Sequence, residues 1–154
     1  MRIVHVLENL NMGGAERVVI DLVREQQRNG HDCAVICLFQ PGALAHELTD
    51  AGIAVTALYK ADGPSLKTLR GLRRLLRQQH ADVLHSHNAM AHYYGVLASV
   101  GMKLVRINTR HGMGTLLGNW RQQWLYRLAM QLTDRACFVC HAAQQRFIDD
   151  GLVP

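Results

Sequence analysis

Two adjacent glycines near the start of the chain stand where a protein backbone could bind an anion. Gly13 and Gly14 follow an apolar segment at residues 3–7 and open a helical pattern that carries Glu16 in its first turn. The first N–H groups of a helix have no partner within it, and the helix dipole adds partial positive charge there. Glycine also lets a phosphate or sugar approach the backbone without meeting a Cβ atom. The pattern predicts a pocket for a phosphorylated ligand, although a tight turn would use the same residue types.

Two common phosphate-binding motifs do not fit this loop. The dinucleotide fingerprint needs G-x-G-x-x-G and an acidic residue after the second strand. Here the glycines are adjacent, and the second apolar run ends in Gln40, Pro41 and Gly42. A Walker loop needs G-K-[ST], which occurs nowhere in the chain.

Histidines follow two later apolar runs. His85 and His87 lie two residues apart, so on a strand they share a face, and Asn88 follows as a helix cap or a pocket residue. His111 follows another apolar run, where it could serve chemistry or cap a loop. A neutral imidazole donates a hydrogen bond, and a protonated one adds positive charge. Zinc needs a tetrahedral set of ligands, and His85 and His87 supply two, so we predict no metal site and expect a ligand pocket or polar packing.

Strand-like and helix-like segments alternate along the chain. Apolar runs predict strands near residues 2–7, 32–39, 53–58, 82–86, 104–108 and 135–140. Helical periodicity predicts helices near residues 14–29, 43–51, 65–79, 89–100, 119–132 and 141–149, with Gly30 and Gly52 at two helix ends. This order predicts an α/β domain with a parallel sheet and helices on both faces. Because ligands bind beyond the carboxyl ends of such strands, we expect segments Glu8–Gly14, His85–Asn88 and Thr109–Gly112 to meet at one edge.

The composition excludes several classes of protein. With 154 residues, 49% of them hydrophobic, the chain can form one domain with a buried core. It has no run of about 18 apolar residues, and its first strand, broken by His5 and Glu8, is no signal peptide. We therefore expect a cytoplasmic protein with reduced cysteines. The net charge of +5 suits an anionic ligand. We predict no nucleic-acid partner, because the basic residues gather on one helix without an aromatic platform.

The cysteines are predicted to pack in the core rather than to bind metal or to undergo redox chemistry. Cys137 and Cys140 form a C-x-x-C within an apolar run that predicts a buried strand. Cys33 and Cys37 fall on one face of another apolar strand and are interpreted in the same way.

Residues 65–79 combine leucines at helical spacing with a run of basic side chains. The basic residues are Lys67, Arg70, Arg73, Arg74 and Arg77. Such a pattern is typical of a core-facing stripe with a solvated basic face, and the alternative hypothesis is contact with anionic lipid. Trp120 and Trp124, four residues apart on a predicted helix, are interpreted as a core stripe, with sugar stacking or a membrane interface as the alternative.

Four segments in this order resemble the N-terminal half of retaining GT-B glycosyltransferases of family four, which use nucleotide-sugar donors. The segments are IVHVLENLNMGGAER, ADVLHSHN, VRINTRHG and DRACFVCHAAQQRFIDDG. The resemblance implies that residues 1–154 form a Rossmann-like domain that mainly binds the acceptor, while a C-terminal domain missing from this chain holds the nucleotide-sugar. It implies transfer of a hexose, with retention, to a glycan or lipid-linked glycan in polysaccharide or lipopolysaccharide synthesis. No cofactor or metal is expected, and this chain by itself is expected to be inactive.

The resemblance also assigns roles to residues. His111 matches the catalytic histidine that meets the donor sugar, and Gly13 and Gly14 match the loop that approaches the donor phosphates and sugar. The acceptor-binding assignments are Glu16, Arg17, His85, His87 and Asn88. Glu16 could equally serve the helix N-terminus, and Arg17 could be an ordinary exposed arginine. The membrane-facing assignments are Arg70, Arg73, Arg74 and Arg77, because many relatives act on lipid-linked acceptors.

The alternative function is a stand-alone Rossmann-like or flavodoxin-like module that binds an anion or nucleotide without catalysis. The sequence beyond Pro154 would separate the two hypotheses, because a second α/β domain with paired glutamates supports the transferase. A cleft face without its partner domain exposes apolar surface, so we also expect self-association of this chain.

Overall fold

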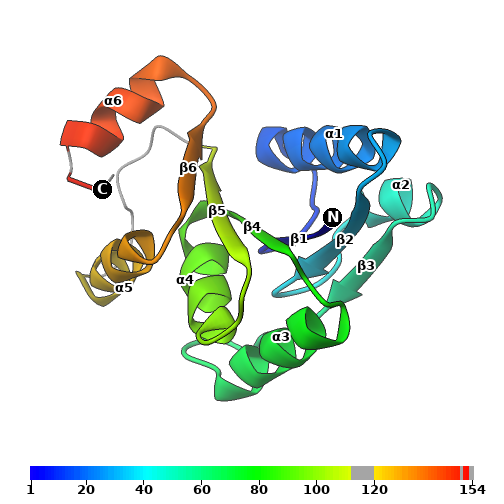
Figure 1. The fold of residues 1–154 in the computed structure, drawn as a ribbon, viewed down its shortest axis with the longest axis horizontal. Coiled ribbons are helices and arrows are strands. Elements are labelled where there is room, and N and C mark those ends of the chain that lie inside the picture. The colour runs from blue at the N-terminus through cyan, green and yellow to red at the C-terminus, as the bar shows by residue number, and fades with distance from the viewer. Residues whose placement is uncertain (112–119, 150, 153–154) are drawn as a thin grey trace.

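A parallel sheet forms the centre of the computed structural model, which describes residues 1–111, 120–149 and 151–152 (Figure 1). The strands of this described part are β1 (Arg2–Leu7), β2 (Asp32–Cys37), β3 (Ala54–Ala57), β4 (Val83–His87), β5 (Val105–Arg110) and β6 (Arg135–Phe138). They lie in the order β3-β2-β1-β4-β5-β6, and each neighbouring pair is parallel. The predicted parallel sheet is confirmed.

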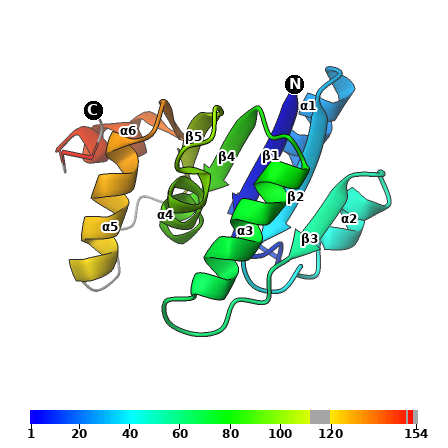
Figure 2. The same ribbon diagram turned by 60° about the horizontal axis from the view of Figure 1, so that its bottom comes forward.

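Helices cover both faces of the sheet. They are α1 (Gly14–Arg28), α2 (Ala45–Thr49), α3 (Leu66–Gln78), α4 (Asn88–Ser99), α5 (Trp120–Gln131) and α6 (His141–Asp149). Helices α1 and α2 lie on one face and α3, α4 and α5 on the other, while α6 lies next to β6 (Figures 1 and 2). None of the helices that the structure describes is long and apolar enough to cross a membrane. Three predicted features lie outside the described residues. They are Gly112, Pro154 and the start of the helix predicted from residue 119.

The alternation of side chains along β1 shows why apolar runs predicted these strands. Ile3 and Leu7 pack in one core cluster with side chains of α1. Val4 and Val6 point the other way and pack with α3 and α4. A parallel strand buried on both faces has few polar positions, so it appears in the sequence as a continuous apolar run.

Glycines end two of the predicted helices as expected. Gly30 and Gly52 have φ angles of +80° and +77°, the left-handed conformation that a glycine adopts without strain. At the N-terminus of α3, the Ser65 hydroxyl caps the helix by accepting a hydrogen bond from the Thr68 N–H at 3.2 Å.

The predicted burial of one cysteine pair is wrong. Cys137 and Cys140 are exposed, because β6 is the edge strand and ends at Phe138. Cys33 and Cys37 lie in β2, inside the sheet, and are buried as predicted.

The preferred core interpretation of the tryptophans is also wrong. Trp120 and Trp124 are 72% and 57% exposed, because α5 turns Tyr126 and Met130 into the core instead. In α3, Leu72 is fully buried as the leucine stripe predicts, whereas Leu66 at the start of that helix is exposed.

Candidate functional site

The carboxyl ends of β1 and β4 lie side by side at the centre of the sheet. From β1 the chain enters α1 on one face, and from β4 it enters α4 on the other (Figure 1). The two connections therefore diverge here, and such a switch point is where open parallel sheets bind ligands. The edge predicted from the sequence coincides with this switch point.

Imidazole rings gather at the switch point. His5 in β1 pairs in register with His85 in β4, and His85 stacks on His87 with ring centroids 4.5 Å apart. His111, just after β5, lies 5.2 Å from His87 between ring centroids. His85 Nε2 lies 2.7 Å from Thr109 Oγ1. The histidines of the two strands are buried, and His111 is half-buried.

Hydrogen bonds join His5, His87 and His111 to helix α1. Gln26 Oε1 lies 2.7 Å from His5 Nε2. His5 Nδ1 lies 3.0 Å from His87 Nε2, and His87 Nδ1 lies 3.0 Å from His111 Nε2. Residues from β1, β4 and the loop after β5 are therefore tied to α1 by one continuous series of polar contacts.

Burial keeps these imidazoles neutral. Desolvation lowers the pKa of His5 to about 4 and that of His85 to about 3, with His5 and His111 adding to the shift of His85. Desolvation also holds the pKa of His87 well below its ordinary value. Burial lowers the pKa of His111 too, although the nearby Glu16 carboxylate opposes that shift. At neutral pH each of these rings therefore has one nitrogen that donates a hydrogen bond and one that accepts.

Three of the buried histidines also form a candidate metal-ligand set. His5, His85 and His87 each offer one nitrogen, and these atoms lie within 4.8 Å of one another. The spacing of His85 and His87 does not predict the third member, because His5 reaches the group from the neighbouring strand β1. His5 and His87 already share a hydrogen bond that a metal ion would have to replace. The expected absence of a metal stays a prediction.

Asn88 holds the loop that carries His111. It is the first residue of α4, with a left-handed φ of +64° that asparagine tolerates better than most residues. Its Oδ1 accepts the backbone N–H of His111 at 3.3 Å, and its carbonyl accepts from Asn108 Nδ2 at 3.4 Å. The N-cap position of α4 falls on His87, so the Asn88 side chain bonds to the His111 backbone instead of capping that helix, and its acceptor-binding role stays a prediction.

Carboxylates also reach this edge, and Glu8 among them was not singled out from the sequence. Glu16 acts electrostatically on both His111 and Glu8. Burial, and then Glu16, raise the pKa of Glu8, while Lys60 opposes the shift. Glu8 follows β1 directly. It begins the segment Glu8–Gly14, which the sequence places at this edge, so its position could have marked it as a candidate site residue.

The glycines of the first loop are not required by the backbone conformation. Gly13 has an extended φ of −169°, and a Cβ there would meet the flexible side chain of Glu16. A Cβ on Gly14 would meet nothing within 4 Å. Gly42 is the opposite case, because its φ is +87° and its Cβ would collide with the backbone of Leu10. The tight-turn interpretation therefore applies to Gly42 rather than to Gly13 and Gly14.

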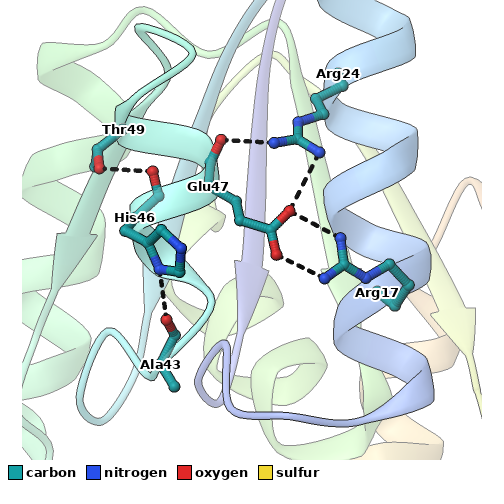
Figure 3. A network of polar contacts seen from close by, with 6 residues as sticks. All are labelled: Arg17, Arg24, Ala43, His46, Glu47 and Thr49. Carbon is teal, nitrogen blue, oxygen red and sulfur yellow. Dashed lines mark hydrogen bonds and ion pairs between the residues drawn. The ribbon is translucent and has the colours of Figure 1, made fainter.

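Arg17 points from α1 toward Glu47 of α2 (Figure 3). Its guanidinium donates to the Glu47 carboxylate at 2.6 and 2.9 Å. Arg24 lies 3.3 Å from that carboxylate and donates to the Glu47 carbonyl at 2.9 Å. The Arg17 hydrogen bonds, aided by both arginine charges, hold the pKa of Glu47 at about 2. The network joins α1 to α2, and the acceptor-binding role of Arg17 stays a prediction.

The arginines of α3 lie apart from the histidines, on the other face of the sheet. Arg70, Arg74 and Arg77 are exposed. Arg73 is half-buried and donates to the carbonyls of Ala98 and Val100, at 2.8 Å each. Arg73 thus joins α3 to the end of α4, while the other three arginines point into solvent.

A largely apolar pocket of about 450 Å³ opens among α3, α4 and α5. Leu69, Tyr94 and Leu125 line it, and Lys60 and Arg121 supply positive charge. Lys60 lies over the Tyr94 ring, with its Nζ 5.6 Å from the ring centroid. The sequence gives no signal for this pocket, because its walls come from separate helices.

The chain belongs to glycosyltransferase family 4, whose model matches residues 12–154. No curated protein matches the chain at a significant level. Its fold is the Rossmann-like half of the GT-B architecture, as the resemblance implied.

Solved structures share this fold at low sequence identity. A glycosyltransferase from Rickettsia africae is 15% identical with a TM-score of 0.78, over 99% of this chain and 40% of that one. Anabaena Alr3699/HepE in complex with UDP is 18% identical with a TM-score of 0.77, over 98% and 41%. UDP-GlcNAc 2-epimerase from Methanocaldococcus jannaschii is 12% identical with a TM-score of 0.67, over 98% and 43%. The chain thus spans about two fifths of these proteins, and the fold serves more than one reaction.

Acid should weaken the folded state through its buried histidines. His5 and His92 have pKa values of about 4 in the folded chain because of burial, against 6.5 for an ordinary histidine. Between these values the unfolded chain binds more protons, so the free energy of unfolding falls as the pH falls. Each such histidine contributes up to about 1.4 kcal/mol per pH unit in this window. Urea unfolding at a series of pH values between 6.5 and about 4 measures the slope.

His92 allows a matched test of that slope. It lies outside the His5–His87–His111 series and bonds the hydroxyls of Ser86 and Thr133 at 2.7 and 2.8 Å. His92→Gln should make the pH dependence shallower. His80→Asn, at an exposed position with positive φ, should leave it unchanged. Parallel slopes for the wild type and His92→Gln would contradict the account.

Alanine substitutions should distinguish Gly14, where a Cβ has room, from Gly42, where the backbone requires glycine. Gly14→Ala should leave the stability unchanged or raise it by up to about 1 kcal/mol, because alanine favours a helix. Gly42→Ala should lower the stability by about 1–3 kcal/mol, because of its left-handed backbone and the collision with Leu10. Urea unfolding measures both, and equal losses at the two positions would restore the tight-turn interpretation of Gly14.

Proposed function

We propose that this domain is the acceptor side of a retaining glycosyltransferase. The full enzyme moves a hexose from a nucleotide-sugar to a hydroxyl of a glycan or lipid-linked glycan. The observation that carries the proposal is the switch point, where His111, Asn88 and an open glycine loop meet in a chain of glycosyltransferase family 4. The structures of Alr3699/HepE hold UDP and UDP-glucose, which supports a nucleotide-sugar as the donor class here.

The residues at this edge suit a reaction driven by electrostatics. The open side of Gly14 allows a diphosphate to reach the N–H groups at the start of α1. Amides fixed where negative charge develops stabilise a departing diphosphate without reorganising. The neutral His111 imidazole then hydrogen bonds to a hydroxyl of the sugar, and Asn88 fixes its position. Retention requires the acceptor hydroxyl to lie on the same face of the sugar as the leaving group.

The proposal divides the enzyme between two domains. This chain spans 40–41% of the glycosyltransferase structures that it matches. A further domain, outside this chain, holds the nucleotide, so the 154-residue chain has no transferase activity of its own.

Titration with UDP separates this proposal from the stand-alone binding module. The 154-residue chain should not bind UDP with a dissociation constant below about 1 mM, whereas a parent enzyme that carries both domains should bind within the micromolar-to-millimolar range typical of substrates. Isothermal titration calorimetry measures both. Micromolar binding by the chain would favour the stand-alone module.

In the parent enzyme, His111→Ala should lower kcat by about 10²–10³-fold, as removal of one transition-state hydrogen bond does. His46→Ala, at an exposed histidine of α2, is the matched control and should leave kcat unchanged. Equal rates for His111→Ala and the wild type would contradict the assigned role.

We also propose that the enzyme is cytoplasmic and contacts the membrane peripherally through α3. The exposed arginines lie on the same helix as Leu66, which is exposed and lines the apolar pocket. Trp120 and Trp124 of α5, a helix that also lines this pocket, are exposed too. Basic side chains next to exposed apolar groups are what an anionic lipid surface attracts. Arg73 is not part of this proposal, because it holds the end of α4.

Charge reversal tests the membrane contact. The triple variant R70E/R74E/R77E should lose most of its binding to vesicles that contain anionic lipid, as measured by co-sedimentation, because each basic residue contributes about 1 kcal/mol near such a surface. A control with the same charge change on other elements is R28E/R135E/R146E, at exposed positions of α1, β6 and α6. Equal loss in both variants, or none in the first, would contradict a contact through α3.

A further inference from the structure

The series of hydrogen bonds from α1 to His111 has a direction, and Gln26 sets it. An amide oxygen accepts hydrogen bonds and cannot donate them. Gln26 Oε1 lies 2.7 Å from His5 Nε2 and 3.9 Å from Cys33 Sγ. Burial raises the pKa of the Cys33 thiol, so the sulfur keeps its proton and donates. Both neighbours of this oxygen are therefore donors, and the proton of His5 lies on Nε2.

Each ring then dictates the state of the next. A neutral imidazole has one N–H and one lone pair, so His5 Nδ1 must accept. Its partner at 3.0 Å, His87 Nε2, must therefore carry the proton of that ring. His87 Nδ1 is left as an acceptor, and at 3.0 Å it requires the proton of His111 to lie on Nε2. A second proton on His5 or His87 would set two N–H groups against each other.

We propose that Gln26, His5 and His87 are positioning residues that lock His111 in the Nε2–H tautomer. The Nδ1 lone pair of His111 is thereby left to accept a hydrogen bond from a hydroxyl of the bound sugar, a ligand that rests on the proposed function. Groups behind a functional histidine commonly choose its tautomer in this way, because the partner of one ring nitrogen determines the state of the other.

The geometry makes this a lock rather than a path for protons. A proton leaving His111 along the series would end at Gln26, whose amide does not take up a proton. It would also pass from a half-buried ring to the fully buried His5, where a charge costs more. His85 adds stiffness, because it packs on His87 and on His5 at centroid distances of 4.5 and 5.0 Å while Thr109 holds its Nε2.

Nitrogen NMR of the imidazole rings tests the lock directly, because ¹⁵N shifts distinguish a protonated ring nitrogen from an unprotonated one. In the 154-residue chain at neutral pH, His5, His87 and His111 should each carry the proton on Nε2. Gln26→Glu keeps an acceptor at the start of the series and should preserve this pattern. Gln26→Lys replaces the acceptor with a donor and should reverse the pattern to Nδ1–H in all three rings.

Gln27→Lys is the matched control, because Gln27 is the exposed neighbour of Gln26 on α1 and the charge change is the same. It should leave every tautomer as in the wild type. An Nδ1–H tautomer in any of the three wild-type rings overturns the lock, as does a Gln26→Lys chain in which His5 reverses and His111 does not. If Gln26→Lys does not fold, the wild-type and Gln26→Glu spectra still decide.

Kinetics of the parent enzyme separate the lock from the proposed function. Gln26→Lys should lower kcat by about 10–100-fold with little change in KM, the size of effect seen when a supporting group behind a functional histidine is lost. Gln27→Lys should not. The NMR pattern needs no substrate, so the predicted tautomers in the 154-residue chain, together with a parent enzyme that lacks transferase activity, would support the lock and overturn the transferase. Wrong tautomers in an active enzyme would overturn the lock and leave the function standing.

Discussion

The parallel pairing of β1 with β4 is the interaction on which the rest of this domain depends. It places His5 beside His85 in the register and brings the carboxyl end of β1, from which the first glycine loop leaves, to the same edge as the carboxyl end of β4, after which Asn88 follows. It also divides the helices, because the chain leaves β1 toward one face and β4 toward the other. The divergence of those two connections makes this carboxyl edge the switch point at which open parallel sheets bind ligands.

Polar groups at the centre of the sheet are tolerated because their partners lie within reach. A buried imidazole without partners would cost the desolvation of two nitrogens. Here His5 bonds Gln26 and His87, and His87 bonds His5 and His111. Such a network is rigid as long as every ring stays neutral, and burial favours the neutral form. The contacts that satisfy the buried imidazoles therefore also fix His111 at the edge of the sheet.

Much of the fold could be predicted from the sequence, because a parallel sheet buried on both faces leaves continuous apolar runs and helices of regular period. The sequence also predicts the edge at which His87, Asn88 and His111 meet. It does not predict the partner of His5, since the β1–β4 register is a contact between distant segments. The burial predicted for Cys137 and Cys140 was wrong for the same reason, because an apolar run has the same pattern in an edge strand as in a central one. The contact of Arg17 with Glu47 joins two separate helices, so the sequence does not predict it either.

A crystal structure of the parent enzyme with a nucleotide-sugar bound tests the central claim most directly. The account predicts a sugar hydroxyl within hydrogen-bond distance of His111 Nδ1 and a phosphate oxygen against the N–H groups at Gly14. A nucleotide-sugar held entirely by other groups, with nothing within reach of Gly14 and His111, would contradict it.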